Sequence, residues 1–295
     1  EHIQFSRKVT GITYLESGLW QVDIWDMAND CPCESLQGQH VVSANGPLSS
    51  PRMPELSGMT EFHGDSFHTA KWNYNVDLRG KNVGIIGTGA SAAQVITSIA
   101  DDVKSLTVFQ RTPTWALPRD DEPTPPEIVS AFENGGYSES LREVDWQSEG
   151  PRELGPGFSF EMLHDPEQNA AICAGIEAMI NAQVDDPELA KLLTPDYPFF
   201  CKRVLFIDDY YTTYNKPHVK LVNDPGGVVA VNEGGVEMAS GDHHEMDVLI
   251  YATGFDSNHI PFPVQGRDGA TLAELFGANE ANNFQMTRPQ SLWGI

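Results

Sequence analysis

The chain has 295 residues, of which 18 are Lys or Arg and 42 are Asp or Glu, so its formal net charge is −24 at pH 7. This charge repels nucleic-acid phosphates and anionic lipid headgroups, which argues against both as partners. No apolar run approaches the roughly 18 residues that a membrane-spanning helix needs, so a membrane-spanning protein is excluded as well.

The four cysteines are too few for a disulfide scaffold. Cys31-Pro32-Cys33 has no second pair and no nearby histidine set that would complete a redox or metal site. We therefore expect reduced thiols, no metal and a cytoplasmic protein. The sequence starts at Glu1, without Met and inside an alternating pattern, and stops at Ile295, which is typical of a piece of something longer.

Short strands are predicted at the start of the chain. Residues 19–25 alternate apolar and polar side chains, as a half-buried strand does. Residues 41–46 are expected to form a short buried strand that ends in a glycine turn. A proline-rich connector over 47–54 and an aromatic-rich loop over 60–79 are expected to follow.

The clearest structural signal is one βαβ unit of about 30 residues. Residues 81–86 predict a buried strand, and 93–100 predict a helix whose apolar positions lie three and four apart. Residues 105–109 predict the next strand, and a glycine turn over 87–92 joins the first strand to the helix. This order predicts a doubly wound, Rossmann-like α/β sheet.

Residues 117–165 break this pattern with many Pro, Gly and acidic residues, and two helices are expected after them. We therefore expect a helical insertion at about 118–195. Asp185 or Asp186 is a candidate cap for the second of these helices, with Pro187 in its first turn. The expected elements are helices over 168–184, 187–193 and 207–214, strands over 219–222 and 228–231, a hairpin turn at 234–235 and a strand over 247–251.

The turn of the βαβ unit reads Gly87-x-Gly89-x-x-Ala92, the pattern of a dinucleotide-binding site. The first glycine permits the tight turn, the second lets the backbone approach a pyrophosphate, and the small third residue lets the helix pack on the strand. The free N–H groups of the helix N-terminus point at the phosphates. The flanking strand and helix favour dinucleotide binding over a merely structural glycine turn.

The residues after the second strand select the cofactor, because an NAD site places an acidic residue there to hold the ribose 2′-hydroxyl. This chain has the sequence FQRT over 109–112 at that place, and Arg111 is its charged residue. An arginine in so acidic a chain favours the 2′-phosphate of NADP. A solvated surface arginine is the alternative.

A longer motif, Phe62-x-Gly64-x-x-x-His68-x-x-x-Trp72, lies just before the Rossmann strand. Taken alone, His68 is more typical of a hydrogen-bonded loop histidine than of a catalyst. The motif resembles the fingerprint F-x-G-x-x-x-H-x-x-x-W of the Baeyer–Villiger monooxygenases, class B flavoprotein monooxygenases that insert oxygen beside a ketone carbonyl. Four further blocks are similar to that family, in its order: 80–90, 107–113, 201–203 and 252–255.

The resemblance implies an α/β flavoprotein with two dinucleotide-binding domains. It predicts a partial FAD-binding domain over 1–75, a Rossmann-like NADP-binding domain over 76–224 that carries the helical insertion, and a truncated return to the FAD-binding domain over 225–295. The family has a first G-x-G-x-x-G for FAD near its N-terminus, and this sequence has none. We therefore expect an internal fragment that lacks this motif and the C-terminal part and is inactive by itself.

The resemblance also implies a role for each candidate site residue. His68 would be a linker residue that couples NADP binding to domain movement, and Arg203 would lie over the flavin ring. Gly46 and Gly254 resemble the two strand-end turns where the chain crosses between the domains. The NADP-binding residues would be Gly87, Thr88, Gly89, Ser91, Ala92 and Gln94 at the pyrophosphate, and Arg111, Thr112 and Lys202 at the 2′-phosphate.

The implied activity is an NADPH- and FAD-dependent insertion of one oxygen atom of O₂ next to the carbonyl of a small-molecule ketone, through a C4a-peroxyflavin, to give an ester or a lactone. An anionic flavin peroxide needs a cation that never deprotonates, which suits Arg203. The alternative for Arg203 and Lys202 is ion pairing with acidic neighbours such as Asp208 and Asp209.

Three other functions stay open at this point. A flavin-dependent monooxygenase of nitrogen or sulfur atoms is the first, although such proteins typically lack the tryptophan that stands here at Trp72. A disulfide reductase would need a redox-active cysteine pair near the flavin, and the pair Cys31 and Cys33 has neither the spacing nor the context. The last is a nucleotide-binding module without catalysis.

Overall fold

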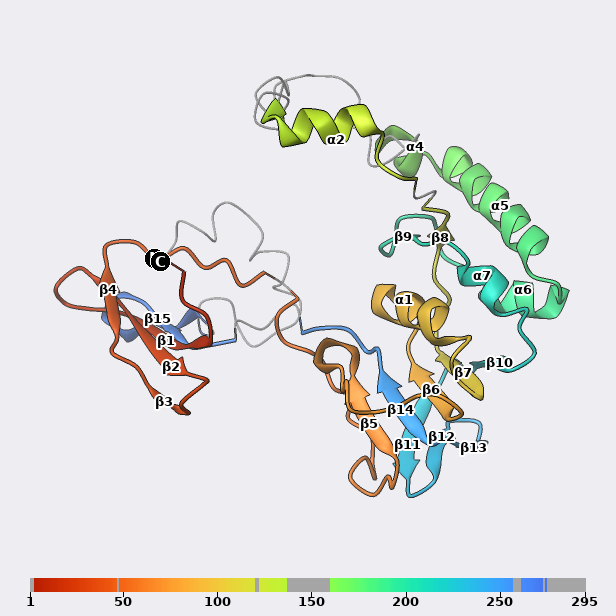
Figure 1. Cartoon of the computed structure of the whole chain (residues 1–295), viewed down its shortest axis with the longest axis horizontal. Coiled ribbons are helices and arrows are strands. Elements are labelled where there is room, and N and C mark those ends of the chain that lie inside the picture. Colours follow the sequence, from red (N-terminus) through yellow and green to blue (C-terminus); the bar gives the residue numbers. More distant parts are fainter. Residues whose placement is uncertain are drawn as a thin grey trace. The chain divides into compact units, whose positions relative to one another are not determined.

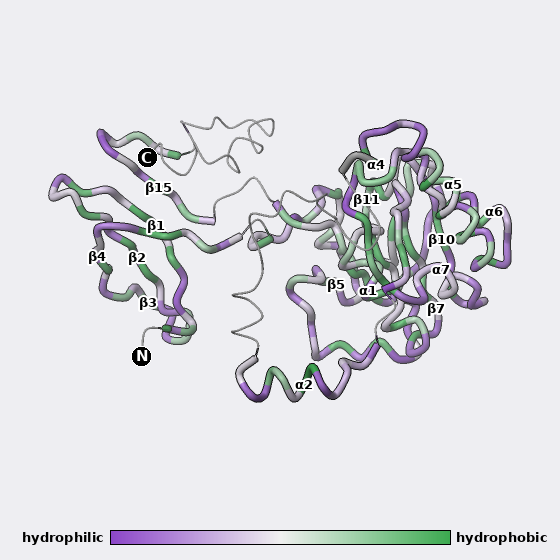
Figure 2. Tube along the Cα trace, turned by 90° about the horizontal axis from the view of Figure 1, so that it is seen from above, coloured by the Kyte–Doolittle hydropathy of each residue, from purple (hydrophilic) through white to green (hydrophobic). Residues whose placement is uncertain are grey.

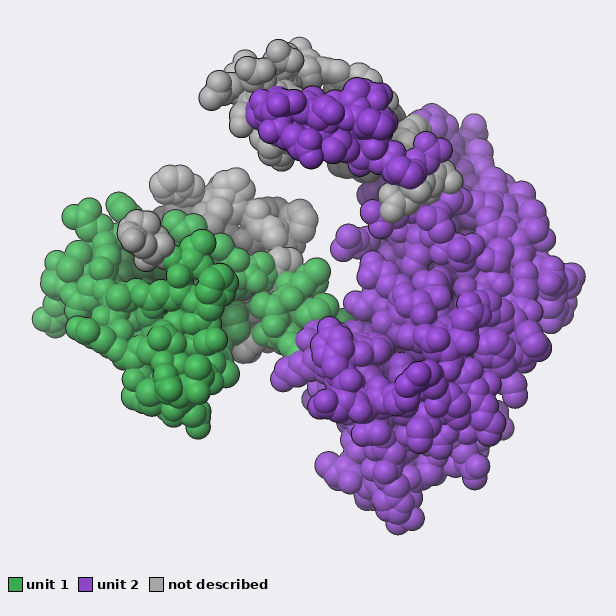
Figure 3. All heavy atoms as spheres, in the orientation of Figure 1, with its two compact units in different colours: residues 1–52, 254–295 green, residues 53–253 purple. Residues whose placement is uncertain are grey.

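The computed structural model describes residues 3–46, 48–119, 122–136, 160–256, 261–272 and 274. The chain divides into two compact units, one of residues 1–52 and 254–295 and the other of residues 53–253 (Figure 3). The first unit is built from both ends of the chain, and the second is one continuous stretch. No helix among the described residues is both long and apolar enough to cross a membrane.

The first unit contains a five-stranded sheet in the order β15-β1-β2-β3, with β4 also paired to β2. The half-buried strand predicted over 19–25 is confirmed as β2, which forms an antiparallel hairpin with β1. Strand β15 joins the other edge of β1 in parallel, so that Ile12 lies opposite Val264. The strands are β1 (Arg7–Tyr14), β2 (Trp20–Asp26), β3 (Cys31–Pro32), β4 (Leu36–Gly38) and β15 (Val264–Gln265).

The strand expected over 41–46 does not form. Val42 is 88% exposed, and no strand of the described residues pairs with this stretch. Apolar residues form a strand only where a neighbouring strand satisfies their backbone N–H and C=O groups. Because a pairing partner can come from anywhere in the chain, the local pattern over 41–46 could not show whether one is present.

The second unit is built on a five-stranded parallel sheet in the order β10-β7-β6-β14-β5 (Figure 1). Helix α1 (Ala90–Ile99) joins β6 to β7 and packs the face that carries Ala92 and Ile96 into the core. The expected βαβ unit and the α/β class are confirmed. Hydrophobic residues run along the strands of this unit (Figure 2). The strands are β5 (Asp65–His68), β6 (Asn82–Ile86), β7 (Ser105–Gln110), β10 (Val219–Asn223) and β14 (Val248–Tyr251).

The boundaries of the compact units differ from the domain boundaries expected at 75 and 224. Strand β5 lies within the stretch expected to be a loop, and it pairs in parallel with β14, which in turn pairs with β6. Residues 53–75 and 225–253 therefore lie in the same unit as the βαβ unit. Strand β5 is only four residues long and buries only its last two, Phe67 and His68, which is too short to show a strand's alternation.

A smaller three-stranded sheet lies between β10 and β14 in the chain. The expected hairpin forms with its turn one residue earlier than predicted, because Asn232 faces Gly235 and leaves Glu233 and Gly234 as a two-residue loop. The apolar side chains of this sheet pack with Phe109 of β7 in a second cluster of the core. The strands are β11 (Val228–Asn232), β12 (Gly235–Met238) and β13 (His243–Glu245).

The insertion after β7 is helical, as expected. The helices predicted over 168–184 and 187–193 are confirmed, and Asp186 caps the second by accepting a hydrogen bond from the Glu188 N–H. The helix predicted over 207–214 is reduced to one turn, because Asp209 before it has φ +60°. Residues 120–121 and 137–159 of the insertion lie outside the described residues. The helices are α2 (Pro126–Glu133), α4 (Phe160–His164), α5 (Pro166–Gln183), α6 (Pro187–Leu193) and α7 (Tyr210–Thr213).

Three neighbouring tyrosines, Tyr210, Tyr211 and Tyr214, are buried in the main core. Burial raises the pKa of Tyr210 to about 12, because a phenolate loses its hydration there. The same cause raises the pKa of Tyr211 and of Tyr214. The folded state therefore holds all three hydroxyls protonated at a pH where an unfolded chain has begun to ionise them.

We expect the free energy of unfolding to fall as the pH rises above 10. The stabilisation from a neutral buried tyrosine is complete below the unfolded pKa of 10.0, and for Tyr210 it is lost between there and about 12. At 1.36 kcal/mol per pKa unit, Tyr210 alone contributes about 3 kcal/mol. Urea unfolding across this pH range measures the slope, which Tyr210→Phe should reduce and Tyr74→Phe, at an exposed ring, should not. A free energy of unfolding that stays constant across this range would contradict the expectation.

Candidate functional site

The glycine turn between β6 and α1 has the geometry of a phosphate-binding loop. Gly87 has φ +116°, and a Cβ there would lie 2.6 Å from the carbonyl oxygen of Ala252. The turn therefore needs glycine at this position. A Cβ on Gly89 would meet no atom within 4 Å, so the space over the second glycine is open. Ala92, in the first turn of α1, is fully buried.

The N-terminus of α1 faces this open space. Gly89 is its N-cap, no side chain caps its first N–H groups, and its first turn holds no acidic residue. Unsatisfied N–H groups and the positive end of the helix dipole favour an anion at this position. The local geometry therefore suits the phosphates of a dinucleotide.

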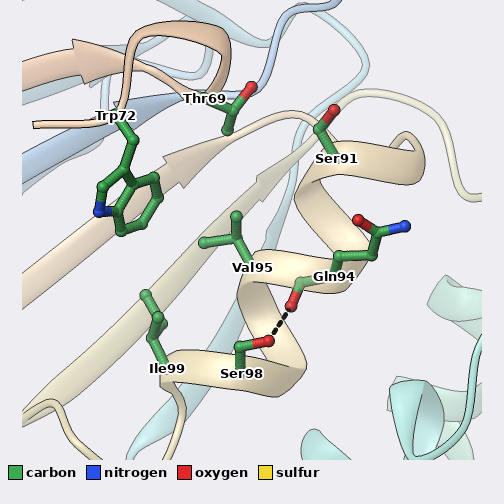
Figure 4. Close-up of a pocket in the computed structure, with 7 residues that line it drawn as sticks. All are labelled: Thr69, Trp72, Ser91, Gln94, Val95, Ser98 and Ile99. Atoms are coloured by element: carbon green, nitrogen blue, oxygen red, sulfur yellow. Dashed lines mark hydrogen bonds between the residues drawn. The ribbon is translucent and has the colours of Figure 1, made fainter.

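Two further residues of α1 that were predicted to bind NADP, Ser91 and Gln94, line a hollow of about 300 Å³ beside the helix. The indole of Trp72 lies across the hollow from the helix, and Val95 and Ile99 lie between them (Figure 4). Thr69 and Ser98 complete the lining, and the Ser98 hydroxyl donates to the Gln94 carbonyl at 2.7 Å. The fingerprint motif and the Rossmann helix thus meet at this hollow.

Each fingerprint residue has a structural role. A Cβ on Gly64 would lie 2.2 Å from the Asp247 carbonyl oxygen, so only glycine lets this backbone approach β14. Phe62 packs against the second core cluster, and Trp72 meets Phe67 edge to face at 5.0 Å. The motif fixes the short edge strand β5 and the turn after it.

His68 is 3% exposed and caps the 3₁₀ turn η1 (Thr69–Lys71). Its Nδ1 accepts a hydrogen bond from the Ala70 N–H at 3.0 Å, which assigns the ring proton to Nε2. A ring buried in this way suits the expected linker role better than acid–base chemistry at Nδ1. The coupling to domain movement stays a prediction.

The segment after β7 is tied to the glycine turn. The Thr88 hydroxyl donates to the Thr112 carbonyl at 2.7 Å, which brings two of the predicted NADP-binding residues together. Arg111 is exposed, and its Cδ lies 3.9 Å from the position of a Cβ on Gly227. Among the described residues Arg111 forms no ion pair with a carboxylate, so its guanidinium is available to an anion.

Lys202 and Arg203 lie on an exposed stretch that leads into strand β9 (Leu205–Phe206). The predicted alternative for them was pairing with Asp208 and Asp209, and no such ion pair exists among the described residues. Asp208 instead accepts a hydrogen bond from the Arg119 N–H at 2.9 Å.

Tyr197 connects the stretch after β7, which carries Arg111, to the stretch that carries Lys202. No sequence signal indicated this residue. Its hydroxyl donates to the Pro113 carbonyl at 2.9 Å, and burial raises the pKa of this hydroxyl. The Trp115 indole N–H donates to the Tyr197 carbonyl at 3.1 Å, and Lys202 Nζ lies 4.6 Å from the centre of the Tyr197 ring. Strand β8 (Ala116–Leu117) also pairs in parallel with β9. The predicted residues Thr88, Thr112 and Lys202 therefore belong to one connected network.

Gly46 and Gly254 both have positive φ, at +65° and +81°. Beyond them, the two stretches that lead from the first unit to the second pair with each other. The Arg52 N–H donates to the Gly254 carbonyl at 2.9 Å, and the Asp256 N–H donates to the Ser50 carbonyl at 2.8 Å. Gly254 thus lies at a boundary between the two compact units, and its role in the crossing between domains and its contact with FAD stay predictions.

A sequence profile of the FMO-like family, described as flavin-binding monooxygenase-like, matches residues 1–132. The Baeyer-Villiger monooxygenase of Streptomyces coelicolor is 37% identical to this chain over 265 residues, which cover 84% of this chain and 47% of the relative. Cyclohexanone 1,2-monooxygenase of Acinetobacter sp is 30% identical over 317 residues, which cover 92% of this chain and 55% of the relative.

The fold is similar to that of the solved OTEMO complex with FAD and NADP, with a TM-score of 0.81 and 32% identity. The match covers 93% of this chain and 58% of that one. The chain spans about half the length of the curated relatives it matches. The similarity in sequence and in fold to these relatives extends over most of the chain, and the chain therefore belongs to the Baeyer–Villiger monooxygenase family.

Proposed function

We propose that the whole protein is an NADPH- and FAD-dependent monooxygenase that inserts one oxygen atom of O₂ next to a ketone carbonyl to give an ester or a lactone. The observation that carries this proposal is the exposed Arg203, which has no carboxylate ion-pair partner among the described residues and lies next to Lys202 in the network that reaches the glycine turn. Such an arginine is suited to hold negative charge beside a bound dinucleotide.

The chain's residues fit NADP. The open backbone at Gly89 and the first turn of α1 would hold the pyrophosphate, with Ser91 and Gln94 on the same helix. The exposed Arg111 would bind the 2′-phosphate, together with Thr112 and Lys202. For FAD, this chain supplies the turns at Gly46 and Gly254 and no second glycine-rich motif. When bound, NADPH supplies the hydride and FAD the reaction with O₂.

Arg203 would act on the charge that develops during oxygen transfer. A guanidinium keeps its charge at any pH at which the protein is folded, and it can donate two hydrogen bonds to one anionic group. Negative charge on the oxygen of the attacked carbonyl would be stabilised by such a donor, and this effect is usually large in a site that excludes water.

The test uses the full-length protein with NADPH, O₂ and an equimolar mixture of a ketone and a thioether, followed by mass spectrometry of the products. An ester or a lactone supports the proposal. Sulfoxide alone would favour a monooxygenase of nitrogen or sulfur atoms, although the presence of Trp72 argues against that class. NADPH consumption that yields only hydrogen peroxide would place the natural substrate outside the mixture. The ketone and O₂ are thus proposed partners, and the exclusion of nucleic acid and the cytoplasmic location stay predictions.

We expect Arg111→Gln and Lys202→Gln each to weaken the binding of NADPH by about tenfold and the binding of NADH hardly at all, because only NADPH carries the 2′-phosphate. The measurement is the KM for each nucleotide in NADPH- or NADH-driven flavin reduction. Arg79→Gln is the control, since Arg79 pairs with Asp77 at 2.8 Å on the surface. Equal losses for both nucleotides would mean that neither cation contacts the 2′-phosphate.

A further inference from the structure

The stretch that carries Lys202 and Arg203 begins with a strained turn. The Cys201 N–H donates to the Pro198 carbonyl at 3.1 Å, and Phe200 has φ +72°. Among the common β-turn types, only type II has a positive φ at the third residue alone, and this position is normally glycine. A phenylalanine there pays a steric cost that the surrounding structure must offset.

The side chain of Asn169, in the first turns of α5, holds this turn. Asn169 is 6% exposed, and its Oδ1 accepts a hydrogen bond from the Phe199 N–H at 3.0 Å. Its Nδ2 donates to the Phe199 carbonyl at 3.1 Å and to the Leu163 carbonyl at the same distance. The carboxamide thus binds both backbone groups of one residue, as a neighbouring strand would.

The other end of the stretch is also fixed. The Leu205 N–H donates to the Trp115 carbonyl at 2.9 Å where β9 meets β8, and Val204 and Leu205 are buried. Phe199 itself is 2% exposed and packs on Trp115. Only the exposed residues 200–203 lie between these two anchors, so a change in the backbone conformation of Phe200 would shift Lys202 and Arg203.

We propose that Asn169 is a positioning residue for the two cations. By binding the backbone of Phe199, it keeps Phe200 in the left-handed conformation and so directs the following residues toward the dinucleotide. Without it, Phe200 is free to relax to negative φ, which reorients the chain up to the β9 anchor. The inference rests on the proposed function in that it takes Lys202 to contact the 2′-phosphate of NADP.

The strain provides a specific test, because glycine at position 200 adopts positive φ without cost. We expect Asn169→Ala to lower the ratio of the NADP⁺ affinity to the NAD⁺ affinity by about tenfold. In the double variant Asn169→Ala/Phe200→Gly, the turn no longer needs the carboxamide, so the preference for NADP⁺ should return. Asn169→Asp keeps the acceptor for the Phe199 N–H but places a carboxylate oxygen against the Phe199 and Leu163 carbonyls, so it should not preserve the preference for NADP⁺.

The measurements are calorimetric titrations of the full-length protein with NADP⁺ and with NAD⁺, together with urea unfolding of each variant. The matched control is Asn181→Ala, since Asn181 lies on the same helix and donates only to the Glu177 carbonyl within it. This variant should leave the ratio of the two affinities unchanged. A purely structural Asn169 would lower both affinities equally, and Phe200→Gly would not restore them, which would overturn the proposal.

The unfolding data separate this inference from the proposed function. The free-energy changes of Asn169→Ala and Phe200→Gly should be non-additive if the carboxamide and the strained turn act on each other. Additive changes would overturn the inference whatever the nucleotide data show. If instead the changes are non-additive and the wild-type protein has no preference for NADP⁺, the proposed contact of Lys202 with the 2′-phosphate is the part that fails.

Discussion

Replacing Arg203 with alanine in the full-length protein is expected to abolish ester or lactone formation while NADPH-driven flavin reduction continues. The reason is that hydride delivery needs the nucleotide in place, whereas oxygen transfer also needs a permanent cation near the developing negative charge. Removing one such donor commonly costs a factor of about a hundred or more in rate. Product formation by mass spectrometry and anaerobic flavin bleaching by NADPH measure the two steps separately.

Two further variants make this result specific to the charge at position 203. Arg203→Lys keeps a cation and loses the planar pair of donors, so it should retain part of the activity. Arg79→Ala removes an arginine that is already paired with Asp77 on the surface, and it should leave both steps intact. Oxygenation that survives in Arg203→Ala would remove this residue from the proposed role.

Replacing Gly89 with valine is expected to abolish nucleotide binding without unfolding the protein. Gly89 has φ −74°, and the space around its missing Cβ is open in the folded chain, so the new side chain causes no clash. It would, however, fill the space through which the backbone approaches a pyrophosphate. We expect the Kd for NADP⁺ to rise by at least about a hundredfold, with an unchanged midpoint of urea unfolding.

Replacing Gly87 with valine should instead lower the stability of the fold, and this variant serves as the comparison. A Cβ there would lie 2.6 Å from the carbonyl oxygen of Ala252, and its φ of +116° disfavours any L side chain, so Gly87→Val should destabilise the fold itself. Gly175→Val on the exposed face of α5 controls for the substitution as such. If Gly89→Val binds NADP⁺ like the wild-type protein, the turn does not hold the phosphates.

The sequence was sufficient to predict those elements whose hydrophobic pattern extends over many residues. The strand, glycine turn, helix and strand over 81–109 combine a buried run with a helical period, and both signals are local. Strand β5 could not be found in this way, since it is four residues long and owes its existence to β14, far along the chain. The same dependence on a distant partner explains the false strand over 41–46.

The candidate site was predictable where a residue acts through its own backbone and not where it acts through a distant neighbour. Gly87 and Gly89 follow from the spacing of one turn. Tyr197 and Asn169 hold their partners through hydrogen bonds to Pro113 and Phe199, and only the folded chain brings those pairs together. The strain at Phe200 was also invisible, because nothing in the sequence indicates that a phenylalanine takes the glycine position of a type II turn.

The pairing of Ser50–Arg52 with Gly254–Asp256 has a consequence for the order in which the two units fold during synthesis and for the exchange of one unit by protein engineering. During translation β1 leaves the ribosome early, but its partner β15 follows only after all of residues 53–253 have been synthesised. The continuous unit can therefore fold first, whereas the sheet of the discontinuous unit is completed only after β15 has been synthesised. Because the paired stretches bring the two ends of residues 53–253 close together, this unit is a candidate cassette for exchange between relatives at the level of the gene.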